Sequence, residues 1–408
     1  MRLFRYVADF PRELRVLPKS IHRVSLVIFL YVTAWGVLDP FLTLYFHDIF
    51  GNYTAVALLS ALVYFFSIFL SLPFGDLTDI VSKKKLMRIF LILYIPFGFI
   101  LAMLSTFFQF AVFRVYHAFL ATGLWSSAET YVRAHSPPRK TAEAMGYFDS
   151  AGALATVIGA FAGGFLMTAF GINALFYLFS IFMIAALFVL PGMPDHHGTP
   201  SVWRGVGQLK TAGVFRFEFR DYLRAPGLFH VSLLSFITNT LYFSTFIVLP
   251  LFSDKLGANY AETGLIYAAF GIPALFEAPF SVLTRTFNRK VVLSAGGFFS
   301  ALCLAAAYLA DSLLTLFVLS LLISLGLSLL RPVIEGMATE LMPRHKVGEF
   351  NGVYRSIVLL AAAVGSFVVG PIADKFSIQT PFLLGAVLMT VFLVVVLFSR
   401  LPNNSEKL

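Results

Sequence analysis

The chain has 408 residues, of which 59% are hydrophobic and only 12% are charged. This composition, combined with repeated apolar runs of about twenty residues, excludes a soluble globular fold and predicts an all-α polytopic membrane protein. The net charge of +9 follows from an uneven distribution of Lys and Arg and gives no argument for nucleic-acid binding.

Apolar runs of transmembrane length recur along the whole chain, separated by short polar segments. They predict twelve transmembrane helices: Leu26 to Phe46, Ala55 to Phe74, Leu86 to Phe107, Phe110 to Tyr131, Tyr147 to Met167, Ala174 to Leu190, Leu228 to Phe252, Ala261 to Val282, Val291 to Leu309, Leu313 to Val333, Val353 to Gly370 and Pro381 to Phe398.

The basic residues predict the orientation of these spans. Segments on one side of the predicted membrane contain 25 of the 30 Lys and Arg residues. Because positive residues are retained on the cytoplasmic side, both termini are expected there, in a multi-pass protein of the plasma (inner) membrane. The only cysteine, Cys303, lies on an apolar span, which excludes an internal disulfide.

Composition also divides the chain into segments. We expect a basic amphipathic N-terminal segment at 1–23, a six-helix bundle at 24–192, a cytoplasmic linker at 193–226, a second six-helix bundle at 227–400 and a cytoplasmic tail at 401–408. The linker contains His196 and His197, but no Cys or carboxylate at ligand spacing accompanies them, so no metal site is predicted.

The two bundles are predicted to be copies of one another. A constant offset of 206 residues relates Gly51 to Gly257, Glu129 to Glu335 and Gly159 to Gly365, with further matches between them. A duplication in which both copies keep the same orientation predicts two bundles related by an axis along the membrane normal.

The loop after the second span contains Gly75, Leu77, Asp79, Lys83 and Lys84. At this spacing the loop resembles motif A of the major facilitator superfamily, although Ile80 and Ser82 stand where Arg and Gly are usual. The resemblance implies a twelve-helix secondary transporter whose first, fourth, seventh and tenth spans line a central cavity.

Two further segments resemble motifs of the same superfamily. Arg114 in the fourth span resembles the arginine of motif B, with His117 and Ala118 in place of Gln and Gly. In the fifth span, Gly159, Gly163 and Gly164 follow the spacing of the antiporter motif C, with Ala160 in place of Pro. This likeness favours antiport, although small residues at this spacing also serve close helix packing alone.

Several polar or aromatic side chains on the expected cavity-lining spans are candidates for binding substrate or protons. Asp39 lies inside the first span, where a lone carboxylate costs about 2.5–3.5 kcal/mol. It is interpreted either as a proton or cation site or as a structural partner of Arg114. His117 is expected either to titrate or to donate a hydrogen bond, and Trp35, Trp125 and Asn239 are expected to line the cavity.

Glu129 and Glu335 occupy equivalent positions on the fourth and tenth spans, and each has an arginine four residues away, Arg133 and Arg331 respectively. These residues are interpreted either as intrahelical salt bridges or as groups that translocate protons.

A second charge pattern involves the motif A loop. The offset of 206 relates Asp79 to Arg285 and Asp149 to Arg355, with opposite charges at each position. Superfamily packing places the second span against the eleventh and the eighth against the fifth. It therefore predicts an inner gate in which Asp79 attracts Arg355 and Arg285 attracts Asp149.

No nucleotide-binding loop, metalloprotease motif or hydrolase motif is present, so an enzyme and a bound cofactor are not expected. The hypothesis is a secondary active transporter, a proton-coupled exporter (antiporter) of a small amphipathic solute that works as a monomer in the lipid bilayer. The alternatives are transport of a nutrient, an anionic metabolite or a lysolipid, or a receptor that binds its ligand without moving it.

Overall fold

A computed structural model describes residues 17–137, 140–195, 201–211, 222, 224–281, 287–343 and 347–399. Within this part of the chain all regular structure is helical. The helices of the first half are α2 (Lys19–Phe50), α3 (Tyr53–Ile80), α4 (Lys83–Tyr94), α5 (Phe97–Met103), α6 (Phe107–His135), α7 (Thr141–Val189) and the 3-10 turn η1 (Leu190–Gly192). They are followed by α8 (Val202–Thr211), α10 (Leu228–Lys255), α11 (Tyr260–Gly271), the 3-10 turn η2 (Ile272–Phe276), α12 (Glu277–Ser281), α13 (Arg289–Tyr308), α14 (Leu313–Leu341), α15 (Val347–Lys375) and α16 (Thr380–Phe398).

Ten helical segments in the described part of the chain are long and apolar enough to cross a membrane. This number is smaller than the twelve predicted spans for two reasons, which concern α7 and the eighth span. The 49 residues of α7 would extend about 74 Å if straight, but Gly171 interrupts them with a non-helical backbone at φ 73° and ψ 178°. The predicted eighth span is divided into α11, η2 and α12, with Pro273 in the 3-10 turn.

The helix ends follow from local sequence and repeat at the predicted offset. Gly51 ends α2 with φ 66°, and Gly257, 206 residues later, follows the end of α10 with φ 82°. Only glycine adopts this left-handed conformation without steric cost. The next helix in each half begins with an asparagine, Asn52 or Asn259, whose side chain accepts a hydrogen bond from a backbone N–H of the first turn.

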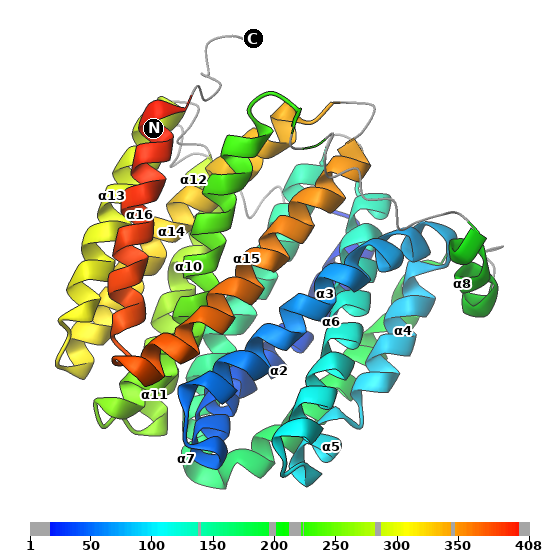
Figure 1. The fold of residues 1–408 in the computed structure, drawn as a ribbon. Coiled ribbons are helices and arrows are strands. Elements are labelled where there is room, and N and C mark those ends of the chain that lie inside the picture. Colours follow the sequence, from blue (N-terminus) through cyan, green and yellow to red (C-terminus); the bar gives the residue numbers. More distant parts are fainter. Residues whose placement is uncertain are drawn as a thin grey trace.

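Helices of the two halves pack against each other at the middle of the molecule. Figure 1 shows α3 and α15 lying side by side along a shared diagonal, and these two helices make extensive contact. Helix α7 packs against α11 in the same way. These contacts confirm the predicted packing of the second span on the eleventh and of the fifth on the eighth.

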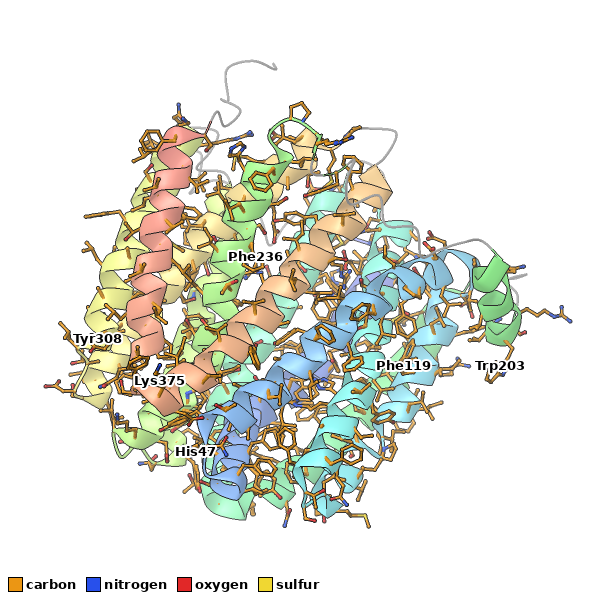
Figure 2. All side chains as sticks on the ribbon, in the orientation of Figure 1. His47, Phe119, Trp203, Phe236, Tyr308 and Lys375 are labelled. Atoms are coloured by element: carbon orange, nitrogen blue, oxygen red, sulfur yellow. The ribbon has the colours of Figure 1, made fainter. Side chains whose placement is uncertain are left out.

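Large apolar side chains cover the outside of the helices (Figure 2). Phe119 on α6 is 39% exposed, and Trp203 on α8 is 86% exposed at the edge of the molecule. An outer surface of this kind is stable only against lipid, as expected for helices that cross a bilayer.

The predicted outer ends of the two halves are joined by hydrogen bonds. Asp374, at the end of α15, accepts hydrogen bonds from the backbone N–H groups of Tyr53 (2.9 Å) and Thr54 (2.8 Å) and from the Thr54 hydroxyl. The carboxylate thus satisfies the free N–H groups at the start of α3 and lies at the positive end of that helix dipole. His47 and Lys375 lie at this same end of the molecule (Figure 2).

Candidate functional site

A cavity lies between the two halves, at the level where α2 meets α11. Its volume is about 50 Å³, enough for water but not for a larger solute. Helices of both halves line it, with Asp39, Thr43, Ser60, Val63, Tyr64, Arg114 and His117 from the first and Phe243, Phe246, Ile247 and Ser366 from the second.

Asp39 connects the two halves directly. Its carboxylate Oδ2 accepts a hydrogen bond of 2.6 Å from the hydroxyl of Tyr267 on α11, a side chain that is only 3% exposed. Asp39 forms no ion pair with another described residue, so the structure does not show the direct Asp39–Arg114 partnership that was one interpretation of the sequence. Tyr267 was not predicted as a site residue, because a single tyrosine on an apolar span gives no signal in one sequence.

Arg114 is buried at the same cavity, with 6% of its surface exposed. Its Nη1 lies 3.4 Å from Nδ1 of His117, one turn along α6, and its guanidinium lies 5.3 Å from the ring centre of Phe46. A guanidinium has no acceptor, so His117 accepts at Nδ1 and carries its proton on Nε2. Trp35 stacks on the His117 ring at 4.1 Å between centroids. Aromatic packing therefore fixes both polar side chains.

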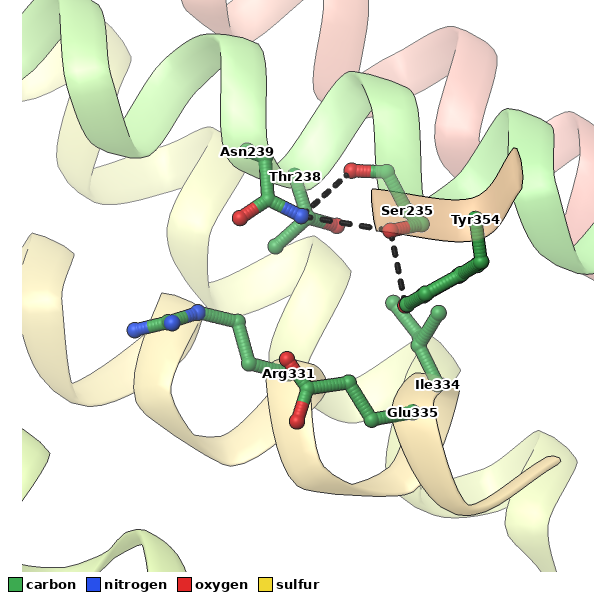
Figure 3. Close-up of a pocket in the computed structure, with 7 residues that line it drawn as sticks. All are labelled: Ser235, Thr238, Asn239, Arg331, Ile334, Glu335 and Tyr354. Atoms are coloured by element: carbon green, nitrogen blue, oxygen red, sulfur yellow. Dashed lines mark hydrogen bonds between the residues drawn. The ribbon is translucent and has the colours of Figure 1, made fainter. Parts of the chain in front are cut away.

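A second polar cluster, drawn in Figure 3, lies in the second half. It consists of Ser235, Thr238, Asn239, Arg331, Ile334, Glu335 and Tyr354. Asn239 donates to the backbone oxygen of Ser235 (2.9 Å) and to its hydroxyl (3.2 Å), and this hydroxyl donates to Tyr354 (2.9 Å). Asn239 therefore belongs to this cluster and does not line the central cavity.

Arg331 differs from the interpretation of an intrahelical salt bridge with Glu335. Its guanidinium donates to Glu277 on α12 at 2.9 Å and lies over the ring of Tyr242 at 4.5 Å, and in Figure 3 it extends away from the Glu335 carboxylate. The reason is the break in the eighth span, which brings the short helix α12 and its carboxylate against α14. Sequence spacing alone does not predict such a contact between helices.

Glu129 does form the predicted intrahelical salt bridge, since Arg133 donates to it at 2.8 Å. It also accepts a bond of 2.7 Å from Arg355 on α15, in the other half. In this structure Arg355 therefore pairs with Glu129 and not with Asp79, and the predicted attraction between Asp79 and Arg355 stays a prediction. Asp79 is exposed on the last turn of α3, whereas the Arg355 side chain reaches Glu129 on α6.

The other pair of the predicted inner gate is Arg285 with Asp149. Arg285 lies outside the described residues, and Asp149 is exposed on α7. The loop lysines of motif A hold their own half together: Lys83 donates to the backbone oxygen of Thr78 (2.7 Å) and Lys84 to that of Met193 (2.5 Å). Gly75 lies on the last part of α3, with no neighbour near the position that a Cβ would occupy.

The glycines of the fifth span lie at helix contacts. A Cβ on Gly159 would lie 2.7 Å from the backbone oxygen of Thr33, and one on Gly163 would lie 2.6 Å from that of Val37, both on α2. Gly164 faces the other half, where a Cβ would lie 2.7 Å from the backbone oxygen of Tyr260. These glycines allow α7 to pack closely on α2 and α11.

Trp125, predicted to line the cavity, packs instead against Phe148 on α7, with ring centres 5.5 Å apart. The linker histidines His196 and His197 lie outside the described residues.

A family model described as Major Facilitator Superfamily matches residues 24–276 and 231–408. The chain belongs to the major facilitator superfamily. It is therefore a multi-pass membrane transport protein, and the superfamily consists of transporters rather than enzymes.

Two individual proteins illustrate the relationship. The uncharacterized MFS-type transporter MJ1560 of Methanocaldococcus jannaschii is 23% identical over 169 residues, which cover 40% of this chain and 43% of that protein. The aligned segment thus spans less than half of this superfamily relative. The crystal structure of the human organic anion transporter MFSD10 (TETRAN) has a TM-score of 0.67 at 15% identity and covers 92% of this chain and 98% of the solved one. This likeness concerns the fold.

Proposed function

We propose that this superfamily member is a secondary transporter that couples the movement of a small amphipathic solute to protons, with Asp39 as the group that binds the proton. The supporting observation is the position of Asp39, a half-buried carboxylate at the central cavity whose only hydrogen bond from a described side chain is the one from Tyr267. Protonation removes a charge that is costly inside a membrane, and α2 and α11 must separate at this bond when the halves move apart.

The proposed architecture is two six-helix bundles, 24–192 and 227–400, with both termini in the cytoplasm and the monomer as the working unit. Twelve crossings follow if the two arms of α7 on either side of Gly171 count separately and if α11, η2 and α12 together form one crossing. Alternating access then consists of closing the contacts at one end while those at the other end open.

The mode of coupling is the second part of the proposal. Export by exchange for protons is suggested by the likeness of the fifth span to the antiporter motif. The glycines of that motif have a packing role at Gly159 and Gly163, so the motif alone does not distinguish exchange from cotransport. The sign of the proton change on binding does distinguish them, because exchange requires competition and cotransport requires joint binding.

The test begins with a thermal-shift screen of the purified protein against anionic, cationic and zwitterionic solutes, because a solute that binds the folded state raises its melting temperature. The best solute is then mixed with protein in weakly buffered solution that contains a pH indicator. Proton release on binding supports exchange, and proton uptake supports cotransport.

The same measurement tests Asp39. The Asp39→Asn variant is expected to bind the solute without a proton change and, in proteoliposomes, to lose accumulation driven by a pH gradient. Asp48→Asn, at the exposed end of the same helix, is the matched control and should behave as wild type. Gradient-driven accumulation by Asp39→Asn would remove Asp39 from the mechanism.

A further inference from the structure

The central cavity contains a cation without an opposite charge in direct contact. Among the described residues, Arg114 forms no ion pair, its Nε has no hydrogen-bond partner, and its one polar side-chain contact is the 3.4 Å bond to His117. A buried guanidinium that lacks a carboxylate is expensive, since its desolvation is not repaid. Its N–H groups are available to an acceptor that enters the cavity.

A second unsatisfied donor faces the same space from the other half. The hydroxyl of Ser366 on α15 is completely buried, has no hydrogen-bond partner among the described residues, and lines the cavity. Arg114 and Ser366 thus offer N–H and O–H donors from opposite halves. Donors of this kind, positioned around one small space, suit an oxygen anion.

Apolar side chains form part of the remaining wall, beside the hydroxyl-bearing Thr43, Ser60 and Tyr64. Val63, Phe243, Phe246 and Ile247 line it, and Phe246 packs edge-on against Phe270 with ring centres 4.8 Å apart. A solute that satisfies the donors and also fills this wall has an anionic head and an apolar body.

We propose that Arg114 and Ser366 form a subsite for the carboxylate or sulfonate group of a small organic anion, whose apolar part contacts the aromatic wall. This proposal rests on the proposed transport function and names the class of its substrate. The cavity of about 50 Å³ is smaller than such a solute, so the anion enters when the two halves separate, and its head group then links α6 to α15.

The subsite has a consequence for coupling to protons. Asp39 lines the same cavity as Arg114, and the other titratable groups that face Asp39 are His117 on α6, Tyr64 on α3 and Tyr267 on α11. A charged Asp39 offsets the attraction of Arg114 for an anion, and a protonated Asp39 leaves it intact. Anion and proton therefore bind cooperatively, which is cotransport.

The experiment uses benzoate as the anionic probe, with benzamide and benzylamine as neutral and cationic counterparts of similar shape. Binding to the purified full-length protein is measured by calorimetry and by thermal shift. Wild type is expected to prefer benzoate, and Arg114→Gln should weaken benzoate binding about tenfold or more, a loss typical of removing a charged hydrogen-bond partner. Ser366→Ala should weaken it less, and neither change should affect benzamide.

One control variant and one test of cooperative binding complete the experiment. Arg133→Gln removes an exposed arginine from the same helix and should leave benzoate binding unchanged. Asp39→Asn, which fixes a neutral side chain, should strengthen benzoate binding at neutral pH by roughly tenfold, within the usual range of coupling between two sites.

The outcomes separate this proposal from the transport function. Equal binding of the three probes, or benzoate binding that survives both Arg114→Gln and Ser366→Ala, would overturn the anion subsite even if Asp39 still couples transport to protons. Weaker benzoate binding by Asp39→Asn would overturn cooperative binding. Conversely, gradient-driven transport by Asp39→Asn would reject Asp39 as the proton site. A loss of benzoate binding in Arg114→Gln would still support the anion subsite in that case.

Discussion

A close contact between α7 and α11, at Gly164, predicts how a single methyl group changes the conformation. A Cβ at residue 164 would lie 2.7 Å from the backbone oxygen of Tyr260 and 2.9 Å from Cα of Ala261. Backbone atoms cannot turn aside as a side chain can, so in Gly164→Ala the two helices must move apart or the contact is strained. Overpacking of this kind costs about 1–3 kcal/mol, which lowers the population of the outer-closed state relative to the open one by about 5- to 160-fold.

The assay is a distance measurement between spin labels on cysteines that replace Ala169, near the end of the first arm of α7, and Lys255, at the end of α10, in a Cys303→Ala background. Gly164→Ala should shift the distribution toward longer distances. The matched control is Gly146→Ala on the same helix, because no atom lies within 4 Å of the added methyl group. The reasoning fails if Gly164→Ala leaves the distribution unchanged, or if Gly146→Ala shifts it equally.

Two further predictions concern the bonds that join the halves. Asp374→Asn should favour the outer-open state in the same distance measurement. An amide has only one acceptor oxygen, so it cannot accept all the hydrogen bonds that the carboxylate accepts at the start of α3, including those from Thr54. The effect should be about 0.5–2 kcal/mol, as for other helix caps. Arg355→Gln should lengthen spin-label distances across the predicted cytoplasmic ends by removing the bond to Glu129, whereas Arg133→Gln, which removes only an intrahelical pair worth about 0.2–0.5 kcal/mol, should not. Equal effects of the two arginine changes would show that the contact with α15 does not hold the halves together.

Much of the fold follows from the sequence because its causes are local or repeated. Apolar length identifies most spans, and the offset of 206 residues predicted that Gly51 and Gly257 occupy equivalent turns, as their positive φ angles confirm. The division of the eighth span was not predicted. Pro273 signals a break, but whether the chain continues across the membrane after a proline depends on packing against α14, which no local pattern contains.

The site was accessible to sequence reasoning only where a charge stands out against an apolar background. Asp39, Arg114 and His117 could be predicted because each is a polar residue on an apolar span, and all three line the cavity. Tyr267 and Ser366 were missed, since a tyrosine or a serine on an apolar helix is common and its direction depends on helix rotation. Finding them requires the relative placement of the two halves.

The same limit applies to Arg355, whose partner in this structure is Glu129 and not the Asp79 of the predicted inner gate, and the repeat shows how this contact arose. The offset relates Glu129 to Glu335 and Arg355 to Asp149. The position equivalent to the Glu129–Arg355 salt bridge, 2.7 Å long, is therefore occupied by two acids. The duplication preserved the backbone arrangement, but the charges diverged, so one of two equivalent contacts attracts while its counterpart repels. The attraction at this pair therefore acts between α6 and α15, whereas the equivalent positions on α14 and α7 carry like charges.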